Sequence, residues 1–482
     1  MGECVLIKCL LWSAQMSKHL TILLTLIAYK ITLIVIGLWA QRRTRDNTDF
    51  FLGGRRLGPV VAAISASASS SSAWTLLGVS GAAYVWGLSA IWLFPATVGG
   101  FLLNWLWVAP RLMPASRASR AITLPEFIAG DSVARTWILR LASVIILFSF
   151  MFYVAAQFQA AGDAFASTFD VSMHTAILIG AGIVVLYTLL GGFWAVSVSD
   201  TLQGLLMALT AVLLPVAALI AVGGFAELMT GLGRTGDLVS LSTTGKFTGI
   251  AAVGFVLGTL GIGMGYPGQP HVVNRFMALR DERALSQARV IAIIWAIVVY
   301  AGMLLLGLCG RVLVNELDAG EQVFFVLSDR LFPPVVAGVM IAAVLSAIMS
   351  TADSQLLTAA SSVSHDWRLA ADDAGSSLGR TRIVVMILSA AAVAVALFAP
   401  ETIFKRVLFA WHAIGSAFGP LVLLRLAGYR IVSGALLASM LTGFLLTIAL
   451  YWVPDTPGDV AERLLPFVLA LLIARLGATR TS

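Results

Sequence analysis

The apolar window at residues 59–84 contains the run Ser65-Ala66-Ser67-Ala68-Ser69-Ser70-Ser71-Ser72, which constrains how the whole chain can fold. A window of this length can cross a bilayer as a helix. Serine hydroxyls compete for backbone hydrogen bonds, so the run predicts an interruption in that helix. Broken backbone at membrane depth is tolerated only where it faces protein or a water-filled cavity. The alternative is that the small serines only allow neighbouring helices to pack closely.

A second interrupted window follows five windows later. Residues 247–267 lead into the run Gly261-Ile262-Gly263-Met264-Gly265-Tyr266-Pro267-Gly268-Gln269-Pro270, in which proline removes N–H donors and glycine weakens the helix. Interrupted spans at matching positions of two inverted halves are typical of secondary transporters, and their binding site lies where the breaks meet. We therefore predict a first repeat at about 59–222 and a second at about 247–426.

The composition requires lipid as the solvent for much of the chain. Hydrophobic residues make up 59% of the 482 residues and charged residues only 11%, whereas a soluble domain is about a quarter charged. We interpret residues 1–20 as an N-terminal extension and residues 21–482 as a single polytopic domain. Thirteen windows predict spanning helices: 21–40, 59–84, 88–108, 137–165, 174–191, 195–222, 247–267, 288–310, 334–362, 381–399, 404–426, 431–452 and 462–479.

Basic residues alternate between the two sides of the predicted membrane. Several arginines lie in linkers such as 41–58 and 268–287, and Arg275 is in the second of these. The linkers on the opposite side hold fewer arginines. Since cytoplasmic loops are rich in arginine and lysine, we predict a multi-pass plasma-membrane protein (inner membrane in a bacterium) with its N-terminus outside and its C-terminus in the cytoplasm. The scattered basic residues do not indicate nucleic-acid binding.

Acidic side chains inside the windows indicate a cation site. Ser350, Asp353 and Ser354 stand at i, i+3 and i+4 of the ninth window, with Thr351 adjacent, so they share one helical face. A carboxylate within the membrane needs a partner or a cation, and hydroxyl, carbonyl and carboxylate oxygens suit Na⁺. The alternative for Asp353 is a buried hydrogen bond to a neighbouring helix. Asp200, near the start of the sixth window, is a second candidate, whose alternative role is a solvated helix N-cap.

Two further ionisable residues have simpler interpretations. Lys30 lies in the first window, where we expect it to reach the interface or to pair locally. His271 follows the second break, and we expect it to form hydrogen bonds within a loop. The five histidines and three cysteines of the chain show no metal-binding or disulfide spacing.

Six motifs follow one another between about residues 20 and 430. They are Phe51-Leu52-Gly53-Gly54-Arg55-Arg56-Leu57-Gly58, Thr123-Leu124-Pro125-Glu126-Phe127, Gly191-Gly192-Phe193 with Asp200, Gly265-Tyr266-Pro267-Gly268-Gln269-Pro270-His271, Met349-Ser350-Thr351 and Gly415-Ser416-Ala417-Phe418-Gly419-Pro420. Together they resemble the sodium:solute symporter family, and most closely its sodium/proline symporters. The resemblance implies an all-α, leucine-transporter-like fold, a 5+5 inverted repeat with one helix before it and two after it.

The resemblance also implies three groups of site residues. The main sodium site would use the backbone carbonyls of Ala68, Ser71 and Ala347 and the hydroxyls of Ser350 and Thr351. A second cation site, found in some members, would involve Asp200, Asp353 and Ser354. The solute would lie among Ser71, Ser72, Ala73, Trp74, Tyr153, Gln157, Ile262, Tyr266 and Pro270.

The chain departs from the proline carriers at two of these places. Ser70 stands where those carriers have an aspartate, and Ile262 where they have a tryptophan. The first change removes a negative charge beside the cation, and the second removes a flat wall from the pocket. One hypothesis is that Asp353 compensates for the charge missing at Ser70.

The leading prediction is a secondary transporter that couples Na⁺ to a small zwitterionic solute, such as the amino acid proline. One alternative is a symporter of another small organic solute, such as a carboxylate or a vitamin-like compound. The other is a solute sensor that keeps the transporter fold, although such a sensor would be expected to carry an output domain. A channel would need continuous pore-lining helices. No nucleophile–base pair indicates an enzyme, and we expect no cofactor other than Na⁺ as coupling ion and no obligatory protein partner.

Overall fold

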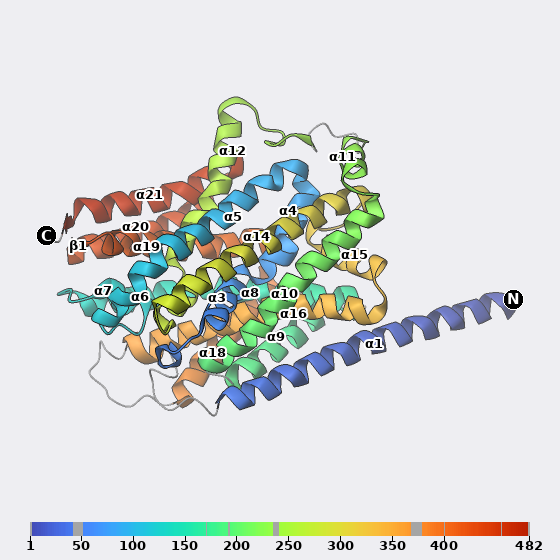
Figure 1. The fold of residues 1–482 in the computed structure, drawn as a ribbon, viewed down its shortest axis with the longest axis horizontal. Helices are drawn as coiled ribbons and strands as arrows, with labels where there is room; N and C mark the ends of the chain where they lie inside the picture. Colours follow the sequence, from blue (N-terminus) through green and yellow to red (C-terminus); the bar gives the residue numbers. More distant parts are fainter. Residues whose placement is uncertain are drawn as a thin grey trace.

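The protein is a bundle of helices in the computed structural model (Figure 1). The structure describes residues 2–41, 52–169, 171–190, 193–234, 241–367, 378–399, 401–454 and 456–480. Within these ranges the only strands are the short β1 (Tyr429–Ile431) and β2 (Ala478–Arg480), which pair antiparallel. Helices dominate because a backbone in lipid must satisfy its own hydrogen bonds. Gly191, Gly192 and Phe51, which belong to the family motifs, lie outside the described residues.

The first half of the chain contains the break in the second window. Its helices are α1 (Gly2–Gln41), α3 (Pro59–Ala73), α4 (Val79–Trp86), α5 (Leu93–Leu102), α6 (Ala109–Ala118), α7 (Leu124–Ala129), α8 (Arg135–Phe169), α9 (Met173–Leu190) and α10 (Phe193–Val222). Short 3-10 or π segments at Gly53–Arg55, Trp74–Gly78, Gly87–Trp92 and Leu103–Val108 lie between them.

The second half contains the other break. Its helices are α11 (Phe225–Arg234), α12 (Gly249–Gly261), α13 (Pro270–Ala278), α14 (Glu282–Leu313), α15 (Val323–Leu331), α16 (Pro334–Ser361), α18 (Leu378–Phe398), α19 (Ile403–Leu426), α20 (Ser433–Tyr451) and α21 (Val460–Leu476). Short 3-10 or π segments lie at Ile262–Gly268, Gly320–Gln322, Ser362–Asp366 and Pro457–Asp459.

Each predicted window overlaps a helix of the structure. In the described part of the chain, nine helical stretches are long and apolar enough to cross a membrane, and α9 and α18 contain shorter apolar stretches. The second and third windows belong to one run of helical segments from Pro59 to Ala118. Residues 2–20, predicted as an extension, continue into the first window as the single helix α1. The number of membrane crossings therefore stays a prediction.

Burial distinguishes the central helices from the peripheral ones. The most apolar window of α19 is 94% buried within the protein and that of α16 is 83% buried, whereas that of α1 is only 17% buried. In Figure 1, α1 runs along one side of the bundle, and α20 and α21 lie together at the opposite edge. α16 contacts α1, α3, α8, α9 and α10. Polar side chains on α16 therefore meet other helices rather than lipid.

Two glycines bring α14 close to the helices around the breaks. A Cβ on Gly302 would lie 1.9 Å from the carbonyl oxygen of Ala211 on α10, and one on Gly307 would lie 2.1 Å from that of Ser80 on α4. Such distances are too short for any side chain, so α14 packs backbone against backbone there. This close approach positions α14 beside both breaks.

Candidate functional site

The predicted interruption of the second window is present at Ser72. This residue has φ 45° and ψ −175°, a conformation that costs a non-glycine residue about 1–3 kcal/mol. The freed N–H group of Ala73 donates to Oε1 of Gln157 at 3.1 Å, and that of Trp74 donates to Oγ of Ser72 at 3.1 Å. The Tyr153 hydroxyl donates to the same Oγ at 3.5 Å. The structure thus brings these five predicted solute residues together at one point, where α8 faces the break.

The second break lies between α12 and α13. Ile262–Gly268 forms a 3-10 segment, Gln269 is extended, and Pro270 is the first residue of α13. Trp411 on α19 donates its indole N–H to the Ile262 carbonyl at 3.1 Å, and its ring lies 4.7 Å from that of Tyr266.

Two neighbours shape the backbone of this second break. A Cβ on Gly265 would lie 2.2 Å from the Trp411 indole nitrogen, so glycine is required for the indole to fit. Asn104, on the segment after α5, donates from Nδ2 to the Tyr266 carbonyl at 3.2 Å. Sequence reasoning missed Trp411 and Asn104, because they come from helices with no interruption.

Tyr300 of α14 joins the two breaks. Its hydroxyl lies 3.3 Å from that of Tyr266 and 3.4 Å from Oγ of Ser71, and it accepts a hydrogen bond from Thr75 at 3.2 Å. The residue is buried. Nothing in the sequence pattern of the eighth window marked Tyr300, because a single tyrosine in an apolar helix usually only packs.

Two oxygen atoms of the predicted main sodium site, the Ala68 carbonyl of α3 and the Thr351 hydroxyl of α16, approach each other between the two helices. Oγ1 of Thr351 donates to the Ser69 carbonyl at 3.2 Å and lies 3.5 Å from that of Ala68. Oγ of Ser350 donates to the Ala347 carbonyl at 3.4 Å. Carbonyl and hydroxyl oxygens from two helices thus converge where the α3 backbone begins to deviate from the helix. Such hard oxygen donors can replace the hydration shell of a small cation.

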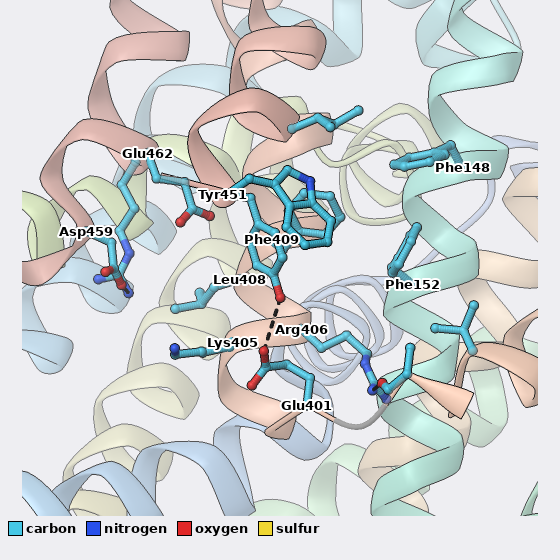
Figure 2. A pocket seen from close by; sticks show the side chains of 15 residues that line it. Phe148, Phe152, Glu401, Lys405, Arg406, Leu408, Phe409, Tyr451, Asp459 and Glu462 are labelled. Carbon is cyan, nitrogen blue, oxygen red and sulfur yellow. Dashed lines mark hydrogen bonds and ion pairs between the residues drawn. The ribbon is translucent and has the colours of Figure 1, made fainter. Parts of the chain in front are cut away.

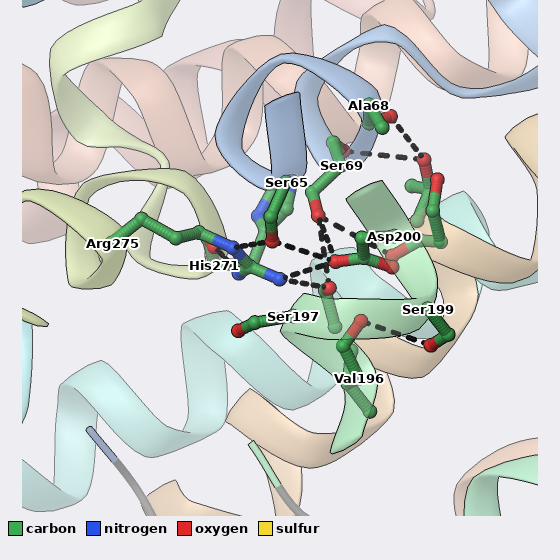
Figure 3. A network of polar contacts seen from close by, with 12 residues as sticks. Ser65, Ala68, Ser69, Val196, Ser197, Ser199, Asp200, His271 and Arg275 are labelled. Atoms are coloured by element: carbon green, nitrogen blue, oxygen red, sulfur yellow. Dashed lines mark hydrogen bonds and ion pairs between the residues drawn. The ribbon is translucent and has the colours of Figure 1, made fainter. Parts of the chain in front are cut away.

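Asp200 is buried in a network with Arg275 (Figure 3). Its Oδ2 accepts hydrogen bonds from Ser65 at 2.9 Å, Ser69 at 3.2 Å and Nη2 of Arg275 at 2.9 Å. Arg275 also donates to Ser65 at 3.0 Å and to Ser354 at 2.6 Å. The interpretation of Asp200 as a solvated N-cap is therefore wrong.

Arg275 and His271 also differ from their sequence interpretation. Arg275, which the charge pattern placed in a cytoplasmic linker, is 1% exposed on α13. His271 is a buried residue of the same helix, and its carbonyl accepts a hydrogen bond from Arg275. Neither burial could be predicted from the sequence, because α13 begins only after the break at Gln269.

The predicted second cation site combines Asp200 of α10 with Asp353 and Ser354 of α16. The structure turns Asp353 away from the other two. Asp200 and Ser354 are bridged by Arg275. Asp353 instead accepts a hydrogen bond from the Thr188 hydroxyl on α9. Successive residues of a helix point about 100° apart, so Asp353 and Ser354 contact different neighbours of a central helix.

Two cavities lie away from the breaks. One, of about 500 Å³, lies among α8, α19, α20 and α21 and is lined by Phe148, Phe409, Tyr451 and Glu401, among others (Figure 2). The other, of about 380 Å³, lies near Gln159 and Glu321. None of the predicted site residues lines either cavity.

Aromatic rings cover the break in α3. The Phe404 ring at the start of α19 lies 5.6 Å from that of Trp74 and 5.2 Å from that of Trp86. Trp74 itself is only 4% exposed. The residues at the two breaks are therefore enclosed by protein in this conformation.

Two interrupted helices that meet around oxygen donors, inside an all-helical membrane bundle, define a secondary transporter. The model of the sodium:solute symporter family matches residues 50–443. The chain therefore belongs to the sodium:solute symporter family. It is a multi-pass membrane transporter, not an enzyme, and its coupling ion is Na⁺.

Curated relatives extend over most of the chain. The osmoregulated proline transporter OpuE of Bacillus subtilis is 36% identical over 434 residues, which are 88% of this chain and 87% of the relative. The high-affinity proline transporter PutP of the same organism is 36% identical over 455 residues, or 92% and 94% of the two chains. The sodium/proline symporter of Escherichia coli is 35% identical over 440 residues, or 88% and 87%.

Solved structures with the same fold confirm the predicted leucine-transporter-like architecture. A Na⁺-coupled sialic acid symporter matches with a TM-score of 0.78 at 18% identity, over 96% of this chain and 99% of the other. Mhp1, a nucleobase-cation-symport-1 family transporter, matches with a TM-score of 0.55 at 15% identity, over 90% and 96%. MhsT matches with a TM-score of 0.52 at 13% identity, over 88% and 99%.

Proposed function

We propose that the chain moves a small zwitterionic amino acid, with L-proline as the first candidate, together with Na⁺. The observation that carries the proposal is a pair of buried N–H donors at the break in α3. Nε1 of Trp74 and Nε2 of Gln157 have no hydrogen-bond partner among the described residues. Unpaired buried donors cost free energy, so they fit an anionic group of the solute. The solute carboxylate would be bound there.

The second break presents acceptors rather than donors. Oδ1 of Asn104 and Oε1 of Gln269 are buried and have no partner among the described residues, and both side chains donate to backbone at the Ile262–Gly268 segment. Acceptors at one break and donors at the other suit a solute with an amino group and a carboxylate. We propose that the solute lies between the two breaks, among Ser72, Ala73, Trp74, Tyr153, Gln157, Ile262, Tyr266 and Pro270.

The coupling Na⁺ would bind beside this pocket, at Ala68, Ser71, Ala347, Ser350 and Thr351. The carbonyl oxygens of Ala68 and Ser71 come from the α3 backbone just before Ser72. The carbonyl of Ala347 and the two hydroxyls come from α16. A cation bound there bridges the two helices, so its loss would let α3 and α16 separate. This linkage would couple sodium release to opening of the site.

Uptake of radiolabelled L-proline into proteoliposomes tests the function. We expect accumulation when Na⁺ is outside and K⁺ inside, and none when K⁺ replaces Na⁺ on both sides. An ionophore that dissipates the sodium gradient is the control and should abolish accumulation. If a panel of other solutes shows sodium-driven uptake of one of them and not of L-proline, that solute would replace L-proline as the proposed substrate. Solute binding without uptake of any solute would support the sensor alternative.

Ile262 lets the solute specificity be tested. Ile262→Trp supplies the flat ring that the proline carriers have at this position. We expect it to change relative uptake of L-proline and bulkier amino acids by about 1–3 kcal/mol, the usual size of one apolar contact. Competition assays in the same proteoliposomes measure this ratio. An unchanged ranking of solutes would place Ile262 outside the pocket.

We propose that the protein lies in the plasma membrane (the inner membrane in a bacterium) with its N-terminus outside and its C-terminus in the cytoplasm. It would act as one polytopic domain with repeats at about 59–222 and 247–426, contacting lipid and needing no obligatory protein partner. The arginine-rich linkers support this orientation.

Cysteine labelling tests the orientation on the two sides of α14. Arg283, at the start of α14, and Asp318, after its end, are both exposed. In a background without the three native cysteines, Arg283→Cys should react with an impermeant maleimide only from the cytoplasmic side. Asp318→Cys should react only from outside. Labelling of both from the same side would contradict a single crossing by α14.

A further inference from the structure

Helix α1 lies outside the predicted repeats but extends polar side chains to α16. The Tyr29 hydroxyl is hydrogen-bonded to Ser346, and the Lys30 amino group donates to the sulfur of Met349. Ser346, Met349 and Asp353 stand at i, i+3 and i+7, so they share the face of α16 that meets α1. The Lys30 side chain therefore extends to the central helix α16 rather than to the membrane–water interface. Its contact there, Met349, is the residue before Ser350.

The hydrogen bond to Met349 does not balance the charge of Lys30. A thioether is a weak acceptor, whereas an ammonium group inside a membrane protein needs a negative partner. Asp353 lies one helical turn beyond Met349, and the charges of Lys30 and Asp353 interact electrostatically.

The Asp353 carboxylate likewise lacks partners that would balance its negative charge. It is fully buried, and Thr188 donates to its Oδ1. Its Oδ2 has no hydrogen-bond partner among the described residues. One neutral hydroxyl does not offset the desolvation of a carboxylate. The buried base near this part of α16, Arg275, already pairs with Asp200 at 2.9 Å.

We infer that Lys30 is the resident counter-charge of Asp353, so that this carboxylate holds the ammonium of α1 instead of a second transported sodium ion. This inference rests on the proposed sodium coupling. Asp200 is neutralised by Arg275 and Asp353 by Lys30, so neither acid of the predicted second cation site keeps a free negative charge. The Na⁺ of the main site would then be bound by neutral oxygen donors alone.

The pair also changes the interpretation of Ser70. If Lys30 neutralises Asp353, this acid cannot compensate for the aspartate that the proline carriers have at Ser70. Lys30 is then a positioning residue. Its charge cancels that of Asp353, and its contact with Met349 orients the helical turn that carries Ser350.

Purified full-length protein in detergent allows a direct test by ²²Na⁺ binding. We expect the wild type to bind one Na⁺ per chain. Asp353→Asn leaves the Lys30 ammonium uncompensated next to the sodium site and should weaken binding by about tenfold or more. The double variant Lys30→Met/Asp353→Asn is neutral again, and its affinity should return to within about threefold of the wild type.

Thermal unfolding of the same variants without Na⁺ gives a second readout. Each single variant should unfold at a lower temperature than the wild type, and the double variant should regain at least half of the loss. The matched control is Lys18→Met, because Lys18 is on the same helix but pairs with the exposed Asp329 near the surface. This control should leave sodium affinity unchanged.

Other outcomes would overturn the inference. One such outcome is that the wild type binds two Na⁺, that Asp353→Asn abolishes binding of one of them, and that adding Lys30→Met does not restore it. Asp353 would then be a sodium ligand. Losses of stability that simply add in the double variant would show that the charges are not paired. If the wild type binds no Na⁺, the proposed sodium coupling fails, and the unfolding experiment still decides whether the pair exists.

Discussion

Replacing Arg275 by methionine is expected to destabilise the protein by about 3–5 kcal/mol, because it leaves Asp200 as an unpaired charge in the core. Arg275 donates to Asp200, Ser65 and Ser354, so it connects α13 to α3, α10 and α16. The two partners of the ion pair are almost fully buried, with exposed side-chain fractions of 2% and 0%. Solvent cannot replace the lost interactions. Thermal unfolding of the purified protein, with expression level as a second readout, measures the loss.

A matched arginine on the same segment provides the control. Arg280 forms an ion pair with Asp281 at 3.1 Å, but both side chains are about half exposed. Such surface pairs contribute only about 0–1 kcal/mol, so Arg280→Met should change stability little. The double variant Asp200→Asn/Arg275→Met should be more stable than Arg275→Met alone, because no unpaired charge remains. Equal stability of Arg275→Met and Arg280→Met would contradict the buried pair.

The second large effect is expected at the main sodium site. Ser350→Ala combined with Thr351→Ala removes two hydroxyls of α16 from the proposed site. That of Thr351 donates to the Ser69 carbonyl of α3, and that of Ser350 donates to the Ala347 carbonyl of its own helix. Each hydrogen-bonding contact with a charged group contributes about 1.5–3 kcal/mol, so the Na⁺ concentration for half-maximal uptake should rise by well over tenfold. Initial rates in proteoliposomes over a range of Na⁺ concentrations measure it.

Two other hydroxyls of α16 serve as the control. Thr358 and Ser361 donate only to carbonyls of their own helix, at 2.7 and 2.8 Å. Thr358→Ala with Ser361→Ala removes the same groups about two turns away and should leave the sodium dependence unchanged. If the Ser350/Thr351 variant keeps the sodium dependence of the wild type, the cation binds elsewhere.

The fold and the location of the breaks could be predicted from the sequence. Apolar windows form helices because lipid offers no hydrogen bonds, and this constraint is local. The interruptions also follow from local sequence. The serine run ends at Ser72, where the backbone leaves the helical conformation, and the Gly/Pro run contains the 3-10 segment Ile262–Gly268. The spacing of the two runs indicated which segments would meet, since inverted repeats place matching helices opposite each other.

The charge pairs were decided only by the tertiary structure. A sequence pattern shows that Asp353 and Ser354 are adjacent, but a helix surrounded on all sides turns them toward different neighbours. Arg275 looked like a cytoplasmic arginine because its burial depends on where the chain resumes a helix after Gln269. Lys30 looked peripheral because its partners are more than three hundred residues away in the chain. Positions of buried charges depend on which helices pack together, and local sequence does not contain that information.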